Sequence, residues 1–320
     1  MPIIDMPLEK LKTYTGTNPC PADFDAFWDE SIAEMEALGT DCELIPWDWN
    51  VPGAECFDLW FTGVGGARIH ALYARPRGVQ GKVPTMLLFH GLTDNAGNMF
   101  DKLCWPAGGF AVAAMDTRGQ GGLSEDVGVV KGNTFRGHIT RGLLDGDPKK
   151  LFFRSVFLDC AQLARIVMAM PEVDETRVAA FGGSQGGALT LACAALTPTL
   201  NSAAAQMPYL CDYRRVWDMD MDVMGYADLR DYFRYRDPLH EHEDEIFTQL
   251  GYIDNINLAH RIRARVMMIT GQLDTLCPPS TQFAAYNRIT SPKKMLLYPD
   301  YAHESYQRMN DYVFRFMQEM

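Results

Sequence analysis

The sequence predicts an α/β fold in which a mostly parallel sheet carries helices on both faces. Short apolar runs of strand length alternate with segments of helical length along most of the chain. Parallel strands are buried on both faces, so they appear as continuous apolar runs. The chain has 320 residues, 47% of them hydrophobic, which is enough for a large core, and we expect a single domain over residues 1–320.

An N-terminal arm, residues 1–45, precedes this alternation and is expected to be helical. Its apolar side chains recur at helical spacing, at Phe24, Phe27, Trp28, Ile32 and Met35. Two strands follow, at 59–61 and 69–73, and the glycine-rich turn 63–66 joins them.

The remaining elements follow in the order expected of a parallel α/β sheet. The apolar runs predict strands at 85–89, 110–115, 178–181, 202–206, 266–270 and 294–298. Helices are expected at 157–170, which Pro171 ends, at 187–194 and at about 305–320.

Two long segments interrupt this order. Residues 120–153 form a glycine-rich excursion, and residues 208–262 form a polar, charged and aromatic insertion before the strand 266–270. Long excursions within a domain tend to be functional. We expect these two to form either the rim of a pocket or an oligomer contact.

The charge balance and the N-terminus limit the expected partners. With 29 Lys and Arg against 41 Asp and Glu, the net charge of −12 argues against nucleic acid and anionic membranes. The first residues lack a basic segment followed by an apolar one, and no stretch approaches the ~18 apolar residues of a membrane span. We therefore expect a cytoplasmic protein without nucleic-acid or membrane partners.

The cysteine pattern predicts free thiols. The eight cysteines contain no Cys-x-x-Cys pair and lie at positions 20, 42, 56, 104, 160, 193, 211 and 277. Reduced, mostly buried thiols fit this pattern better than a disulfide framework or a zinc site, with a Cys20–Cys42 disulfide as the alternative. We expect no metal and no organic cofactor.

The most specific motif is Gly182-Gly183-Ser184-Gln185-Gly186, which has the form Gly-x-Ser-x-Gly. The apolar run 178–181 leads into it, and the helix-forming stretch 187–194 follows. Strand, tight turn, serine and helix are the context in which this motif forms a nucleophile elbow. The glycines leave room for the close approach of strand and helix. The motif predicts a serine hydrolase with Ser184 as its nucleophile.

A serine nucleophile needs a base, and the base needs an orienting carboxylate. In the α/β-hydrolase order the acid follows the serine and the histidine comes last. Asp274 follows the strand 266–270, and His303 follows the strand 294–298. Both lie past the C-terminal ends of expected parallel strands, where open α/β sheets place their chemistry. We therefore expect a Ser184–His303–Asp274 triad.

Each of these residues also has a purely structural interpretation. An aspartate after a strand often caps the next helix, which the nearby Pro278-Pro279 would suit. A late histidine is often structural or exposed. The competing histidines do not follow the strand after Asp274, which favours His303 over His70, His90, His138, His240, His242 and His260.

The oxyanion hole is expected to consist of two backbone N–H groups. One belongs to Gln185, the residue after the nucleophile, and the other is assigned to Leu92 in the loop after strand 85–89. Arg118 and Gln120 follow strand 110–115, and we expect them to be structural residues near the site. An internal ion pair is favoured for Arg118 over the alternative, the binding of an anionic substrate.

One acidic and histidine-rich run needs a separate interpretation. His240-Glu241-His242-Glu243 is reminiscent of a metal site, but residues two apart do not share a helix face. We interpret the run as solvated charge.

Taken together, these segments resemble the acetyl xylan esterase and cephalosporin-C deacetylase family, carbohydrate esterase family 7. The resemblance covers essentially the whole chain. It rests on Pro21 to Phe24, Phe27-Trp28, Arg118-Gly119-Gln120, Thr140-Arg141-Gly142, Gly182 to Gly187, Asp274 to Thr281, and His303-Glu304.

The resemblance implies an intracellular α/β-hydrolase that removes acetyl groups from small esters, such as acetylated xylo-oligosaccharides and cephalosporin C. It also implies a homo-hexamer, a dimer of trimers, whose active sites face an internal cavity. Two alternatives stay open: a broader short-chain acyl esterase or an amidase or peptidase on the same fold, and a non-enzymatic binding protein. The complete triad disfavours the last of these.

Two positions depart from the family pattern. Leu92 stands where the family usually carries a tyrosine, so the backbone donor is kept while an aromatic wall and its hydroxyl are lost. We therefore expect a wider or more apolar acyl side. Ala302 replaces the usual glycine before His303, which we expect to be a minor steric change.

Overall fold

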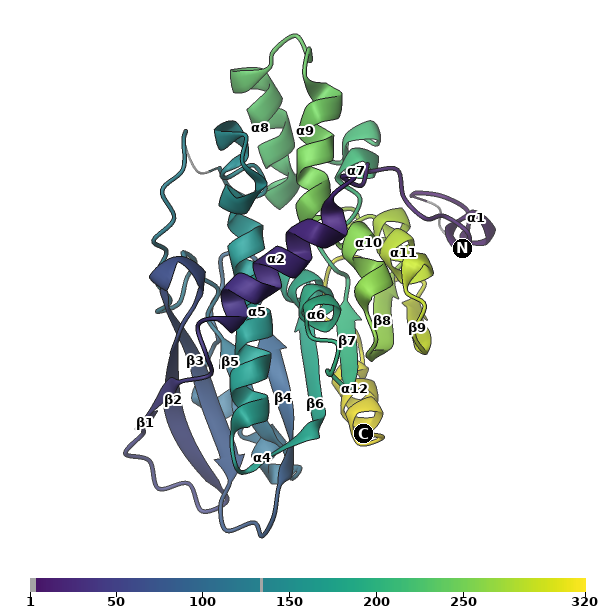
Figure 1. Cartoon of the computed structure of the whole chain (residues 1–320). Coiled ribbons are helices and arrows are strands. Elements are labelled where there is room, and N and C mark those ends of the chain that lie inside the picture. Colours follow the sequence, from purple (N-terminus) through teal and green to yellow (C-terminus); the bar gives the residue numbers. More distant parts are fainter. Residues whose placement is uncertain (1–3, 133–134) are drawn as a thin grey trace.

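The central sheet passes through the whole molecule in the order β1-β2-β3-β5-β4-β6-β7-β8-β9 (Figure 1). The computed structural model describes residues 4–132 and 135–320. The strands are β1 (Cys42–Pro46), β2 (Ala54–Thr62), β3 (Arg68–Pro76), β4 (Val83–Phe89), β5 (Ala111–Met115), β6 (Val173–Gly183), β7 (Ser202–Gln206), β8 (Arg265–Gly271) and β9 (Lys293–Tyr298).

The sheet is antiparallel at one edge and parallel through the rest. The pairs β1–β2, β2–β3 and β3–β5 are antiparallel, and every pair from β5 to β9 is parallel. The mostly parallel α/β-hydrolase architecture expected from the sequence is therefore confirmed. The register places Gly182 beside Phe89 of β4 and Gly183 beside Gln206 of β7, at the centre of the sheet.

Helices cover both faces of the sheet. They are α1 (Leu8–Leu11), α2 (Phe24–Glu36), α3 (Met99–Lys102), α4 (Cys104–Ala107), α5 (Phe152–Ala169), α6 (Gln185–Leu196), α7 (Tyr213–Asp218), α8 (Ala227–Arg236), α9 (Glu243–Leu250), α10 (Asn255–Leu258), α11 (Pro279–Arg288) and α12 (Met309–Met317). The larger apolar core includes side chains of α2, α5 and α6, and a second core on the opposite face includes side chains of α4 and α12. In Figure 1, α2 crosses α5 on the near face, and α4 and α12 lie behind the sheet.

The insertion 208–262 contains the helices α7 to α10 and lies between β7 and β8. Figure 1 shows α8 and α9 projecting beyond the end of the sheet at which β6 stops. The Asp228 carboxylate on α8 accepts hydrogen bonds from the backbone N–H groups of Gly137 (2.7 Å) and Ile139 (3.1 Å). Burial raises the pKa of Asp228 to about 6. This carboxylate joins the insertion to the excursion 120–153.

The N-terminal arm is attached to the same insertion. The buried Asp212 carboxylate accepts hydrogen bonds from the Tyr14 hydroxyl (2.7 Å) and from the backbone N–H groups of Thr17 (3.0 Å) and Asn18 (2.9 Å). A buried carboxylate is tolerated when several donors replace its lost water. Segments far apart in the chain therefore meet at one end of the sheet.

Several boundaries differ from those expected. The end of the arm, expected to be helical, forms β1, an edge strand without apolar alternation. Helix α5 begins at Phe152 rather than 157, and its first residues, Phe152, Phe153 and Arg154, are all buried. Helix α12 begins at Met309 rather than about 305, after Arg308 in a left-handed conformation (φ 62°).

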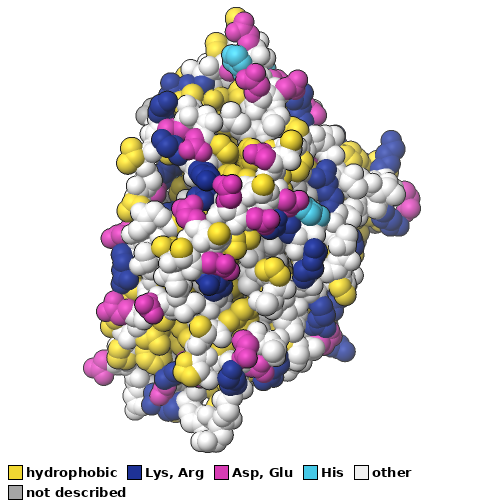
Figure 2. Space-filling model, in the orientation of Figure 1, with side chains coloured by type: hydrophobic (Ala, Val, Ile, Leu, Met, Phe, Trp, Pro, Cys, Tyr) yellow, Lys and Arg dark blue, Asp and Glu magenta, His cyan; other side chains and the backbone are white. Residues whose placement is uncertain are grey.

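The surface and the thiols bear on the expected partners. In the part of the chain that the structure describes, no helix combines the length and apolarity needed to cross a bilayer. Figure 2 shows acidic and basic side chains interspersed over one face, with hydrophobic ones gathered at the lower left, over the β1–β3 edge.

All eight cysteines are free, so the alternative Cys20–Cys42 disulfide is not formed.

Candidate active site

Ser184 alone forms the turn between β6 and α6. Its backbone has φ 57° and ψ −120°, a conformation that is costly for any residue other than glycine. Neighbouring backbone groups hold it there: the Ser184 N–H donates to the Gln206 carbonyl (3.0 Å), and its carbonyl accepts from Ala188 (3.1 Å) and Tyr209 (3.0 Å). The turn directs the serine side chain away from both the strand and the helix.

The flanking glycines are required by close backbone packing. A Cβ atom on Gly186 would lie 2.0 Å from the carbonyl oxygen of Phe89, and one on Gly182 would lie 2.6 Å from the same oxygen. A Cβ atom on Gly187 would lie 2.5 Å from the carbonyl oxygen of Gln206. The elbow therefore packs directly against the ends of β4 and β7, and no side chain fits between them.

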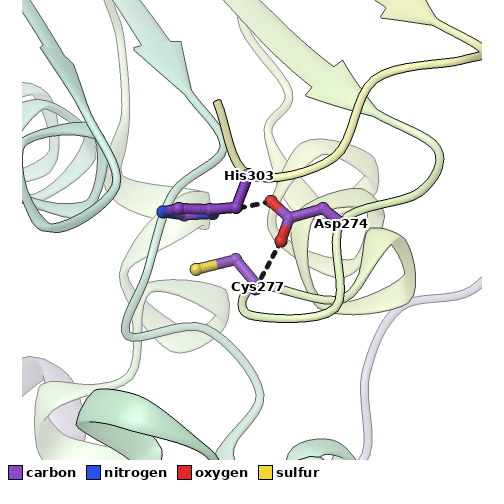
Figure 3. A group of neighbouring side chains, drawn as sticks. All are labelled: Asp274, Cys277 and His303. Atoms are coloured by element: carbon purple, nitrogen blue, oxygen red, sulfur yellow. Dashed lines mark hydrogen bonds and ion pairs between the residues drawn. The ribbon is translucent and has the colours of Figure 1, made fainter. Parts of the chain in front are cut away.

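The structure brings Ser184, His303 and Asp274 into one chain of hydrogen bonds. The Ser184 hydroxyl donates to Nε2 of His303 (2.9 Å), and the Nδ1–H group of His303 donates to Oδ2 of Asp274 (2.9 Å). Figure 3 shows the imidazole ring of His303 held beside the carboxylate. Asp274 follows β8 and His303 follows β9, so both reach the edge of the sheet where β6 delivers Ser184.

Asp274 is completely buried and its orientation is fixed by four donors. The backbone N–H groups of Leu276 (2.9 Å) and Cys277 (2.8 Å) donate to Oδ1. The Gln282 side-chain amide (3.3 Å) and His303 donate to Oδ2. The carboxylate therefore holds the imidazole in the tautomer that leaves Nε2 free to accept a proton.

Gln120 joins Gln185 to Thr93, the residue that follows Leu92. The side-chain amides of Gln120 and Gln185 pair reciprocally (2.8 and 3.0 Å), and Oε1 of Gln120 also accepts from the backbone N–H of Thr93 (2.9 Å). Gln185 is the first residue of α6, so its N–H has no intrahelical partner. The N–H of Leu92 makes no hydrogen bond with any described residue. Neither amide therefore has a hydrogen-bond partner among the described residues.

Arg118 does not face this site. Its guanidinium is buried and makes two hydrogen bonds of 2.6 Å to Asp159 on α5, together with bonds to the carbonyl oxygen of Val64. The internal ion pair expected for this arginine is therefore present, and it connects the β2–β3 turn, the loop after β5 and α5.

A second buried carboxylate near the site, Asp116, was not expected from the sequence. This buried carboxylate accepts from Nδ1 of His70 (2.6 Å) and from the backbone N–H groups of Ala96 (2.6 Å) and Leu123 (2.9 Å). It thereby joins the loop after β4, which carries Leu92, to the loop after β5, which carries Gln120. The only local signal is its position, directly before Thr117 and Arg118 at the end of β5.

Leu92 lies where the excursion and the insertion meet the sheet. A Cβ atom on Gly225 would lie 2.8 Å from Cδ2 of Leu92 and 2.5 Å from the Tyr209 hydroxyl oxygen. That hydroxyl is buried and has no hydrogen-bond partner among the described residues. A separate groove of about 1010 Å³ lies between α4 and α12, and Ser184 is not among the residues that line it. The surroundings of Leu92 are therefore the better candidate for the substrate pocket.

The family model for acetyl xylan esterases matches residues 1–320. The chain belongs to the acetyl xylan esterase family. Acetyl xylan esterase 1 from Thermoanaerobacterium sp. is 54% identical, covers 99% of both chains and has a TM-score of 0.96. Acetyl xylan esterase from Paenibacillus sp. is 35% identical, covers 98% of this chain and 99% of that one, and has a TM-score of 0.93.

A relative from Xylanibacter ruminicola, acetyl esterase Axe7A, is 28% identical over 307 residues. The match includes 92% of this chain but only 65% of that protein, so the chain spans about two thirds of that relative's length. The resemblance seen in the sequence is thus confirmed at the level of the family. These matches indicate a carboxylic ester hydrolase.

The close packing of the elbow glycines against the end of β4 can be tested by substitution. We expect Gly186→Ala to lose most soluble, active protein, because the added methyl group meets the Phe89 backbone at 2.0 Å and overpacking costs about 1–3 kcal/mol or more. Gly91→Ala is the matched control, since nothing lies within 4 Å of its Cβ position. Thermal unfolding and esterase rates check both variants. Equal stability of the two variants would contradict the packing described.

Proposed function

We propose that the protein is a serine carboxylesterase that removes acetyl groups from small esters, among them acetylated xylo-oligosaccharides and cephalosporin C. The observation that carries this proposal is the pair of 2.9 Å hydrogen bonds that join Ser184, His303 and Asp274. The two structural relatives named as acetyl xylan esterases support the acetyl group and the xylan-derived substrate. The proposal of cephalosporin C as a substrate is supported only by the family resemblance of the sequence.

The proposed mechanism proceeds by acyl transfer. His303 takes the proton of the Ser184 hydroxyl as its oxygen attacks the ester carbonyl. Asp274 orients the imidazole and stabilises the imidazolium that forms. The backbone N–H groups of Gln185 and Leu92 donate to the tetrahedral oxygen. His303 then gives its proton to the leaving alcohol, and water hydrolyses the acyl-enzyme by the same route.

Gln120 acts in this scheme as a positioning residue rather than a catalytic one. Its side chain joins the Gln185 side chain to the Thr93 backbone, so it fixes the distance between the two proposed oxyanion donors. Each such donor is worth about 3 kcal/mol of barrier when it is correctly placed. The mechanism uses no metal and no organic cofactor.

The assignment of the nucleophile is tested by Ser184→Ala. We expect kcat on p-nitrophenyl acetate to fall by at least about 10⁴-fold, because the hydroxyl that forms the acyl-enzyme is removed. Ser305→Ala, at an exposed serine near His303, is the matched control and should keep its rate. Turnover near the wild-type rate in Ser184→Ala would refute the mechanism.

The replacement of tyrosine by Leu92 predicts a tolerant acyl site. We expect the wild type to hydrolyse propionyl and butyryl esters alongside acetyl esters. Leu92→Tyr should lower the ratio of butyryl to acetyl kcat/KM by about tenfold or more, since one misfitting methylene costs about 1–3 kcal/mol. A series of p-nitrophenyl esters measures this ratio. Strict acetyl preference in the wild type would show the expectation to be wrong.

We also propose a cytoplasmic homo-hexamer, a dimer of trimers. The family resemblance supports this assembly, and the free thiols suit a reducing compartment. Strand β1 is an edge strand with Ile45 43% exposed, which suits contact with another chain. Light scattering of the purified protein should give six times the 36.0 kDa chain mass. A monomer at micromolar concentration would contradict this assembly.

A further inference from the structure

Cys277 places a thiol beside the two residues that orient the proposed base. One ligand atom from each of Asp274, Cys277 and His303 lies within 4.8 Å of the others. Figure 3 shows the Cys277 side chain extending alongside the His303 ring. The three donors are a carboxylate oxygen, a sulfur and an imidazole nitrogen, a set typical of zinc sites in proteins.

The position of the thiol is fixed by the fold of the loop. The backbone N–H groups of Leu276 and Cys277 both donate to Oδ1 of Asp274, so the chain turns back over the carboxylate before α11 begins at Pro279. Cys277 is 2% exposed. The thiol is therefore held beside the carboxylate rather than sampling many positions.

We propose that this group is an inhibitory site for soft divalent metal ions, Zn²⁺ above all. Two ligands at about 2.1 and 2.3 Å from a tetrahedral zinc ion lie about 3.5 Å apart. Donors within 4.8 Å of one another reach that separation with a closure of about 1 Å. The His303 side chain is 17% exposed and Asp274 is buried, so an ion enters past the imidazole. Metal binding at this site does not require the proposed function, but its inhibitory effect does, because inhibition is measured as a loss of esterase activity.

The chemistry of the three groups selects the ion. A bound Zn²⁺ ion compensates the charges of a thiolate and a carboxylate, and it accepts sulfur and nitrogen ligands as readily as oxygen ligands. Mg²⁺ and Ca²⁺ prefer oxygen ligands and gain little from a sulfur and a nitrogen.

Occupancy of the site would remove the base from the reaction. An ion on Nε2 of His303 displaces the Ser184 hydroxyl. An ion shared by Nδ1 and Asp274 replaces the hydrogen bond between them, and the ring proton moves to Nε2. In either case the imidazole cannot accept the serine proton.

The test is a Zn²⁺ titration of p-nitrophenyl acetate hydrolysis. We expect reversible inhibition of the wild type that EDTA relieves, with no effect of Mg²⁺ or Ca²⁺ at the same concentrations. Cys277→Ala and Cys277→Ser should each need at least about tenfold more Zn²⁺ for half inhibition, because even the loss of an outer-shell partner of a metal ligand weakens affinity about 10- to 100-fold. The matched controls are Cys104→Ala and His242→Ala, which change an exposed thiol and an exposed imidazole outside this group and should respond as the wild type does.

Binding is measured separately with Co²⁺ as the probe. The wild type should give a thiolate-to-cobalt charge-transfer band that Cys277→Ser lacks, whether or not the protein hydrolyses esters. A protein with the band and no esterase activity would refute the proposed function and keep the metal site. Unchanged half-inhibition in both Cys277 variants, or a cobalt band unaffected by Cys277→Ser, would overturn the site.

Discussion

The left-handed backbone of Ser184 is the constraint on which the rest of this site depends. It turns the chain from β6 into α6 at one residue. Its N–H donates a hydrogen bond to the Gln206 carbonyl, and its carbonyl accepts hydrogen bonds from Ala188 and Tyr209. A strained conformation persists only where the surrounding structure determines it. Here the ends of β4 and β7 supply that restraint through backbone contact with the elbow glycines.

Buried carboxylates connect the loops that surround this turn. Asp116 joins the loops after β4 and β5, Asp228 joins the insertion to the excursion, and Asp212 joins the insertion to the N-terminal arm. Each accepts several hydrogen bonds from backbone N–H groups. A buried carboxylate with all its hydrogen bonds made favours one arrangement of the loops, because any arrangement that breaks those bonds leaves a buried charge uncompensated. The position of Leu92 beside Gly225 follows from these connections.

The sequence could predict the parts of the site that have a local pattern or a defined order. The Gly-x-Ser-x-Gly motif at Ser184, and the positions of Asp274 and His303 after apolar runs, lead to residues that the structure brings within hydrogen-bonding distance. It could not predict the pairing of Gln120 with Gln185, because that contact depends on how two loops fold together. Helix α5 shows the same limit, since the burial of its first residues, Phe152 to Arg154, depends on how distant segments pack around them.

We propose that Ser184 is an activated nucleophile in an accessible site. Treatment of the wild-type protein with a fluorophosphonate probe, followed by peptide mass spectrometry, tests this claim without any choice of substrate. We expect one adduct per chain, located on Ser184. No adduct, or an adduct on a different serine, would contradict it.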